Sequence, residues 1–247
     1  MKWIQTFAFF INDDCPDPYG RYLSLRRDFL RKIGQGPKNL TPIFSVEGGA
    51  VLEDNLDRVA MLHKDGIKLL TLTWNGENRI GGGCKTDKPL TDFGKRVIKE
   101  INSVKMGCDL SHINEKGFYS AVELAEFPLA THSNCRKICD HPRNLSDSQI
   151  KLITEKGGII GLCFYPEFLG GDVFEKIYAN VAHLLELGLE KHIAIGSDFD
   201  GAPMDKRLSD ISQAGILFEE LEKRGMPKAV IDKIFYDNAY NFIANLS

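Results

Sequence analysis

Apolar runs rich in β-forming residues alternate with amphipathic helical segments along the whole chain, and this alternation restricts the fold more than any other feature. We expect seven strands, at residues 3–11, 42–46, 67–73, 106–111, 128–131, 158–165 and 192–197. Helices are predicted between and after them, at residues 20–35, 51–65, 91–105, 115–126, 146–156, 172–187, 209–224 and 227–245. Such alternation predicts a parallel sheet. The expected fold class is α/β, a TIM-like (β/α) barrel forming one domain over residues 1–247, which lacks the first of the eight strands that a complete barrel has.

Composition excludes several classes of function. The 247 residues are 43% hydrophobic and 26% charged, as in an ordinary soluble domain. A net charge of −3 provides no basic surface for nucleic acid. No apolar run approaches the roughly 20 residues of a membrane span. The run 3–11 contains Gln5 and Thr6 and has no small-residue cleavage site after it, so we interpret it as a buried strand rather than a signal peptide. We therefore expect neither a nucleic-acid nor a membrane partner.

The six cysteines are scattered and form no CxxC pair. This pattern predicts reduced thiols in a cytoplasmic protein. Cys135, Cys139 and His141 offer an alternative zinc site, but they lack a clear fourth ligand. The glycine run at residues 80–83 lacks the strand and helix that flank a nucleotide-binding loop, so we predict a flexible active-site loop there.

Two histidines end consecutive predicted strands within residues 107–144. His112 and His132 are separated by a predicted helix, and a parallel arrangement delivers both imidazoles to one rim, which suits Zn²⁺. Taken alone, the pair is equally compatible with two structural histidines. Glu47 and Asp198 end two further strands, at the rim where a barrel carries its active site. Acids and histidines at four separate strand ends indicate a metal-dependent hydrolase.

Six short motifs cover nearly the whole chain: Val46-Glu47-Gly48-Gly49, Leu70-Thr71-Leu72-Thr73, Asp109-Leu110-Ser111-His112, Thr131-His132-Ser133, Arg143-Asn144 and Gly196-Ser197-Asp198-Phe199-Asp200-Gly201. Each is unspecific alone, but together and in this order they resemble the renal (membrane) dipeptidase family, zinc metallopeptidases of the amidohydrolase superfamily. The resemblance implies a dipeptide substrate, two zinc ions, and hydrolysis of the amide bond by a metal-bound hydroxide.

The resemblance also implies catalytic and metal-binding roles. Glu47 matches the carboxylate that bridges the two zinc ions, and so counts as both a metal and a catalytic residue. His112 and His132 match the ligands of the second ion. Asp198 matches the acid/base that orients the water and carries its proton.

Three further matches imply substrate contacts. Arg143 matches the residue that binds the C-terminal carboxylate of the substrate, a task for which a planar guanidinium is suited. Tyr165 matches a residue of the pocket wall. Trp74 stands where characterised relatives commonly have a histidine that stabilises the developing oxyanion, so oxyanion assistance and pocket size are expected to differ.

One departure concerns the metals. The family's opening strand ends in a His-x-Asp pair that binds the first zinc ion, and no predicted strand of this chain ends in such a pair. The first histidine, His63, lies on a predicted helix. We expect a chain that is N-terminally shortened relative to the family. Glu47, His112 and His132 suffice for one ion with an open position, so one zinc ion or none are alternatives to two.

Three functions remain open. The first is a zinc-dependent dipeptidase, and the second is a degenerate, non-catalytic or single-metal barrel of the same family. The third is a glycosidase that uses Glu47 and Asp198 as its carboxylate pair, which gives no role to the two histidines. The absence of one barrel strand exposes the edges of its neighbours, and we therefore expect a tendency to form homo-oligomers.

Overall fold

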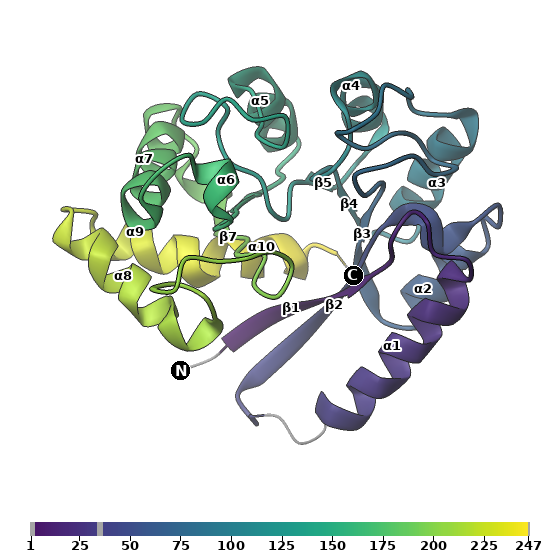
Figure 1. Cartoon of the computed structure of the whole chain (residues 1–247), viewed down its shortest axis with the longest axis horizontal. Helices are drawn as coiled ribbons and strands as arrows, with labels where there is room; N and C mark the ends of the chain where they lie inside the picture. Colours follow the sequence, from purple (N-terminus) through teal and green to yellow (C-terminus); the bar gives the residue numbers. More distant parts are fainter. Residues whose placement is uncertain (1–2, 34–36, 247) are drawn as a thin grey trace. The chain divides into compact units, whose positions relative to one another are not determined.

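The computed structural model describes residues 3–33 and 37–246. The chain divides into two compact units, Met1–Pro128 with Leu246–Ser247, and Leu129–Asn245 (Figure 1). Both units combine helices with parallel strands, so the predicted α/β class is confirmed, and all seven predicted strands are present. The single domain remains a prediction. Within the described ranges, no helix is both long and apolar enough to cross a membrane.

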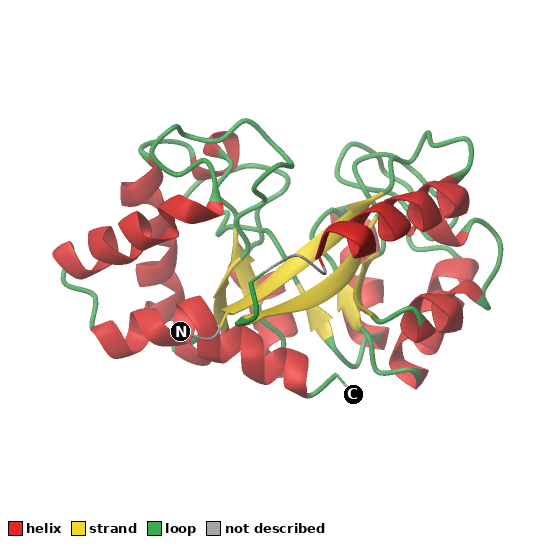
Figure 2. Cartoon of the chain, turned by 90° about the horizontal axis from the view of Figure 1, so that it is seen from below, coloured by secondary structure: helices red, strands yellow, loops and turns green. Residues whose placement is uncertain are grey.

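The first unit is built on a parallel sheet whose strands lie side by side in chain order. They are β1 (Trp3–Phe10), β2 (Leu40–Glu47), β3 (Ile67–Thr71) and β4 (Gly107–Asp109), and the order continues to β5 (Pro128–Leu129) at the boundary of the units. β1 and β2 are the longest strands, each of 8 residues, and are the long yellow arrows in Figure 2. Parallel neighbours require crossover connections. The helices of these connections are α1 (Pro18–Ile33), α2 (Arg58–Lys64), α3 (Asp92–Ser103) and α4 (Glu115–Leu124).

The core of this unit follows from its apolar patterns. β3 is an almost continuous apolar run, as expected for a strand covered on both faces, and Leu70 is fully buried. α3 buries Val97, Ile98 and Ile101, which are spaced along one helical face. Its first turn is capped by Thr91, whose hydroxyl accepts a hydrogen bond from the Gly94 N–H at 3.0 Å.

The second unit contains a parallel pair of strands, β6 (Ile160–Leu162) and β7 (Ile193–Ile195). A capping box forms at Ser146: its hydroxyl accepts from the Gln149 N–H, and the Gln149 side chain accepts from the Ser146 N–H. This box opens the first of the unit's six α-helices. They are α5 (Asp147–Glu155), α6 (Pro166–Leu169), α7 (Val173–Glu186), α8 (Ala214–Lys223), α9 (Lys228–Asp232) and α10 (Asn238–Ala244).

Three helix predictions differ from the structure. The segment predicted as a helix at 51–65 forms a 3₁₀ turn at Gly49–Leu52, and α2 begins only at Arg58. Glu53 lies between them with φ 49°, and the Asn55 side chain accepts from the Asp57 N–H, so local turn hydrogen bonds replace the helix. The helix predicted at 209–224 begins at Ala214, after a 3₁₀ turn at Ile211–Gln213. A π-helical turn at Lys233–Asp237 interrupts the helix predicted at 227–245. The predicted end of the helix at 20–35 falls at residues 34–36, which are outside the described residues.

The glycine loop is ordered, so the prediction of a flexible loop is wrong. Gly82 and Gly83 are buried, and each takes part in an antiparallel bridge, to Glu77 and Ile113 respectively. A Cβ at Gly83 would lie 1.7 Å from the Trp74 carbonyl oxygen. Glycine is therefore required for close packing of two backbone segments here rather than for mobility.

Candidate active site

Glu47 is the last residue of β2, and the backbone immediately after it fixes its position. Gly48 has φ 114°, and a Cβ there would lie 2.1 Å from the carbonyl oxygen of Ile11, so only glycine fits. The Ile11 N–H donates to the Glu47 carbonyl oxygen at 2.8 Å. The carboxylate is thus presented at the carboxyl end of the sheet.

Glu47 and His112 form an acid–imidazole pair within the first unit. Glu47 Oε1 lies 3.0 Å from His112 Nε2, and the two side chains are 17% and 7% exposed. The other ring nitrogen, Nδ1, lies 3.0 Å from Asn75 Oδ1. A neutral imidazole has one N–H and can donate to only one of these two oxygens. A cation between Nε2 and the carboxylate satisfies both groups, so this pair fits a metal ion.

A buried aspartate holds the turn that carries His112. Asp109, at the end of β4, is fully buried. It accepts hydrogen bonds from the Thr71 hydroxyl at 2.6 Å and from both the N–H and the hydroxyl of Ser111. The Asp-Leu-Ser-His motif is therefore a folding unit in which the aspartate orients the following histidine.

His132 follows β5 in the second unit and is 7% exposed. Its Nδ1 lies 2.8 Å from the Thr131 hydroxyl. As at His112, a hydrogen-bonding partner engages Nδ1, an arrangement that orients the rings of metal-binding histidines. The role of His132 as a ligand stays a prediction.

Three buried asparagines hold the loop between His132 and Leu145. The Asn134 side chain donates to the Cys163 carbonyl oxygen and accepts from the Cys163 N–H. Asn144 donates to the carbonyl oxygens of Cys139 and Phe168, at 2.9 and 2.8 Å. Asn180 accepts from the Cys135 N–H at 2.8 Å. The loop that carries Arg143 is therefore tied to α6 and α7.

Arg143 is 4% exposed, which is rare for an arginine without a carboxylate partner. Its Nη2 donates to the His132 carbonyl oxygen at 3.2 Å. Its Nε and Nη1 are buried without a hydrogen-bond partner among the described residues. The guanidinium lies 5.3 Å from the centre of the Phe168 ring. Buried, unpaired donors on a cation are suited to bind an anion.

Aromatic side chains surround this guanidinium. The Phe168 ring lies 4.6 Å from the His141 ring and 4.8 Å from the Tyr165 ring. His141 Nδ1 accepts from the Arg143 N–H at 3.1 Å. Burial, and then the charge of Arg143, lowers the pKa of His141, so this imidazole is neutral near pH 7. A hydrogen bond to Glu167 raises the pKa of Tyr165.

Asp198 lies in the turn after β7 in a backbone conformation that aspartate seldom adopts. Its φ is 61°, and Asp200 in the same turn has φ 68°. Its Oδ2 lies 3.9 Å from Cys163 Sγ. Left-handed backbone at residues other than glycine gathers at functional sites, where the surrounding structure maintains it.

Three other sequence predictions can be placed. The Trp74 ring packs 5.1 Å from Phe10 and 6.4 Å from the His112 ring, so the indole stands beside the candidate ligand.

The chain does contain one His-x-Asp tripeptide, His63-Lys64-Asp65, but it lies at the end of α2 and not at the end of a strand. Asp65 accepts there from the Tyr22 hydroxyl at 2.9 Å. Burial raises the pKa of the Cys135 thiol to about 12, which disfavours the thiolate that the alternative zinc site needs.

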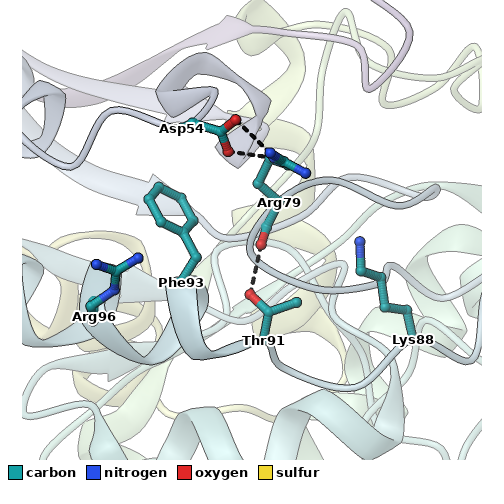
Figure 3. Close-up of a pocket in the computed structure, with 6 residues that line it drawn as sticks. All are labelled: Asp54, Arg79, Lys88, Thr91, Phe93 and Arg96. Atoms are coloured by element: carbon teal, nitrogen blue, oxygen red, sulfur yellow. Dashed lines mark hydrogen bonds and ion pairs between the residues drawn. The ribbon is translucent and has the colours of Figure 1, made fainter.

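A separate pocket of about 450 Å³ lies on the first unit (Figure 3). None of the predicted site residues lines it. Arg79 pairs with both carboxylate oxygens of Asp54, and Lys88 donates to the Asn78 carbonyl oxygen at 2.7 Å. Its cations are largely engaged within the protein, so the pocket gives no argument for a ligand. The residues that line it are Asp54, Arg79, Lys88, Thr91, Phe93 and Arg96.

Sequence reasoning missed the residues that hold the site residues in place. Asn75, Thr131 and Phe168 touch His112, His132 and Arg143, and none of them was predicted. Two signals were available in the sequence: Asn75 lies two residues after the end of a predicted strand, and Thr131 ends a predicted strand and belongs to the Thr131-His132-Ser133 motif.

An α/β fold that presents a carboxylate and an oriented imidazole at the ends of parallel strands has the features of a metal-dependent hydrolase. Residues 28–245 match the membrane dipeptidase family, peptidase family M19. The chain belongs to this family and is an enzyme of the metallodipeptidase class.

Individual proteins are similar to this chain in sequence or in fold. An uncharacterized protein encoded in the pqqA 5′ region of Klebsiella pneumoniae is 32% identical over 225 residues, which cover 85% of this chain and 83% of that protein. A metallopeptidase from Rhodobacter sphaeroides has a TM-score of 0.90 at 24% identity, over 98% of this chain and 86% of that one. A dipeptidase of family M19 has a TM-score of 0.88 at 25% identity, over 98% and 85%. The chain spans about half the length of other curated relatives that it matches.

Proposed function

We propose that this chain hydrolyses the amide bond of dipeptides with the help of zinc. Glu47, His112 and His132 would hold the ion, because a carboxylate and two neutral imidazoles are ligand types that zinc takes. The observation that carries the proposal is the contact of 3.0 Å between Glu47 Oε1 and His112 Nε2, with Nδ1 of the same ring engaged by Asn75. When bound, zinc supplies a Lewis acid that polarises the amide carbonyl and lowers the pKa of water.

Arg143 binds the C-terminal carboxylate of the dipeptide. Its buried, unpaired Nε and Nη1 atoms and its near-complete burial support this role, because a guanidinium binds a carboxylate through charge-assisted hydrogen bonds. Tyr165, which packs against Phe168 beside the guanidinium, forms part of the pocket wall. Trp74 contributes bulk and an indole N–H where relatives commonly carry a histidine.

Asp198 takes the proton of the attacking water and returns it to the leaving amine. A carboxylate suits this task because it accepts a proton and donates it again within one turnover. Its left-handed backbone supports a functional role, since such strain persists where the surrounding structure enforces it.

The number of ions separates this function from its main alternative. The resemblance to the family implies two ions, whereas Glu47, His112 and His132 alone would hold one ion with an open coordination position for water. A barrel that binds peptides without hydrolysing them is the alternative. Measuring the zinc content of the purified protein distinguishes them, because a chain that retains no zinc in the presence of excess metal is not the enzyme proposed here.

Removal of the metal is expected to abolish hydrolysis. Dialysis against a chelator should lower the rate with L-Ala-L-Ala and L-Ala-D-Ala below detection, and added Zn²⁺ should restore it. The second peptide is included because the Rhodobacter sphaeroides structure holds a phosphinate mimic of L-Ala-D-Ala. Full activity after verified metal removal would contradict the proposal and favour a mechanism based on carboxylates alone.

The edge of the sheet supports self-association. β1 is the terminal strand of its sheet and pairs with β2 along one side, and Phe10 at its end is 40% exposed. We therefore propose that the chain tends to form homo-oligomers by edge pairing. Light scattering over rising concentration should show a mass above that of one chain, and a constant monomer mass would refute this. The six cysteines are scattered and form no CxxC pair, a pattern that favours a reducing compartment, so we also propose a cytoplasmic location, to be tested by cell fractionation.

A further inference from the structure

We propose that Asn75 is a positioning residue for His112, whose side-chain oxygen sets the orientation and the protonated nitrogen of the imidazole. Asn75 lies in the loop after β3, two residues past the Leu70-Thr71-Leu72-Thr73 motif. The inference rests on the proposed function, since its purpose is to direct His112 Nε2 toward a metal ion.

The contacts of the Asn75 side chain identify its oxygen, Oδ1, as the atom that faces the His112 ring. Asn75 Oδ1 lies 3.0 Å from His112 Nδ1 and accepts from the Cys84 thiol at 3.2 Å. The side-chain oxygen faces the ring and can only accept, so this contact favours the tautomer with the proton on Nδ1. The lone pair of a neutral His112 is then on Nε2, the nitrogen 3.0 Å from Glu47 Oε1. Asn75 thereby selects the tautomer that binds a cation beside the carboxylate.

The loop that carries Asn75 is anchored on both sides. The Gly76 N–H donates to Asp13 Oδ2 at 2.7 Å, and the Lys85 N–H donates to the Asn75 carbonyl oxygen at 3.1 Å. The same loop reaches the His112 segment directly, because the Asn114 N–H donates to the Gly82 carbonyl oxygen at 3.0 Å. The Asn75 oxygen is therefore held in place before any metal binds, as a preorganised site requires.

Zinc affinity gives the first test. Asn75→Leu keeps the approximate size of the side chain and removes the acceptor, so its affinity for Zn²⁺ should fall by ~10–100-fold, the usual effect of losing such a partner. Asn75→Asp keeps an acceptor and should bind Zn²⁺ at least as tightly as the parent. Competition with a chromophoric chelator measures all three proteins, and thermal unfolding confirms that each is folded.

Nuclear magnetic resonance of ¹⁵N-histidine-labelled, metal-free protein gives a second test that is independent of zinc. The parent should have a larger fraction of His112 protonated on Nδ1 than Asn75→Leu, because the leucine variant lacks the acceptor at that nitrogen. The same spectrum contains its own references. His192 Nδ1 donates to the Gly158 carbonyl oxygen at 2.7 Å and must be protonated, whereas His141 Nδ1 accepts from the Arg143 N–H and must not be.

The outcomes distinguish failure of the proposed function from failure of the positioning role of Asn75. If the parent binds no Zn²⁺ but its His112 Nδ1 proton depends on Asn75, the proposed function fails and the positioning role stands. If Asn75→Leu keeps both the Nδ1 proton and the zinc affinity of the parent, the positioning role is overturned. Asn75→Ala repeats the test if the leucine variant does not fold. A parent ring protonated on Nε2 alone overturns the inference without any variant.

Discussion

Asp198→Asn is expected to lower kcat for dipeptide hydrolysis by ~10²–10⁴-fold, the usual contribution of a general acid–base group. The amide keeps the size of the side chain but cannot accept a proton from water and return it to the leaving amine. Zinc content should be unchanged, because the proposed ligands are other residues. The comparison therefore requires kcat, KM and metal content from the same preparation.

Asp200→Asn is the matched control. Asp200 lies in the same turn, has the same left-handed backbone with φ 68°, and is exposed. Its replacement should leave kcat within about twofold of the parent, because surface substitutions of this kind have small effects. If Asp198→Asn behaves like this control, Asp198 is not the acid–base group, and the strained turn must have another purpose.

Arg143→Met is expected to lower kcat/KM for dipeptides by ~10²-fold, since losing one partner of a buried charged pair costs about 2–5 kcal/mol. Dipeptide amides provide the control because they lack the C-terminal carboxylate. The parent should hydrolyse these amides poorly, and the methionine variant should show no further loss with them. An equal loss with both kinds of substrate would mean that Arg143 does not bind the carboxylate.

Arg143→Met also tests whether the guanidinium stabilises the folded protein. Nε and Nη1 of Arg143 are buried without partners among the described residues, so replacing them with an apolar side chain removes two unsatisfied donors. The free energy of unfolding without substrate should therefore stay the same or rise, although the bond from Nη2 to the His132 carbonyl oxygen is lost. A fall of more than about 3 kcal/mol would indicate a structural role instead.

The strands were predictable because their signal is local. The run predicted at 67–73 is strand Ile67–Thr71, and that at 192–197 is Ile193–Ile195, each shortened by one or two residues at an end. Strand identity depends on short apolar runs between turn residues, which the sequence shows directly. Helix 51–65 failed because its apolar spacing is helical, while hydrogen bonds at Glu53 and Asn55 favour a turn.

The amino-acid sequence by itself determined the kinds of side chain at the strand ends: the carboxylates Glu47 and Asp198, the imidazoles of His112 and His132, and the guanidinium of Arg143. It also determined the motifs by which the chain is assigned to its family. Only the tertiary structure decided which ring nitrogen of His112 faces Glu47, and that Asn75, 37 residues earlier in the chain, orients the ring. Only the tertiary structure left two nitrogen atoms of Arg143, Nε and Nη1, buried and unpaired among the described residues. The physical reason is that these properties depend on hydrogen bonds between distant residues, which form only when packing brings their segments together.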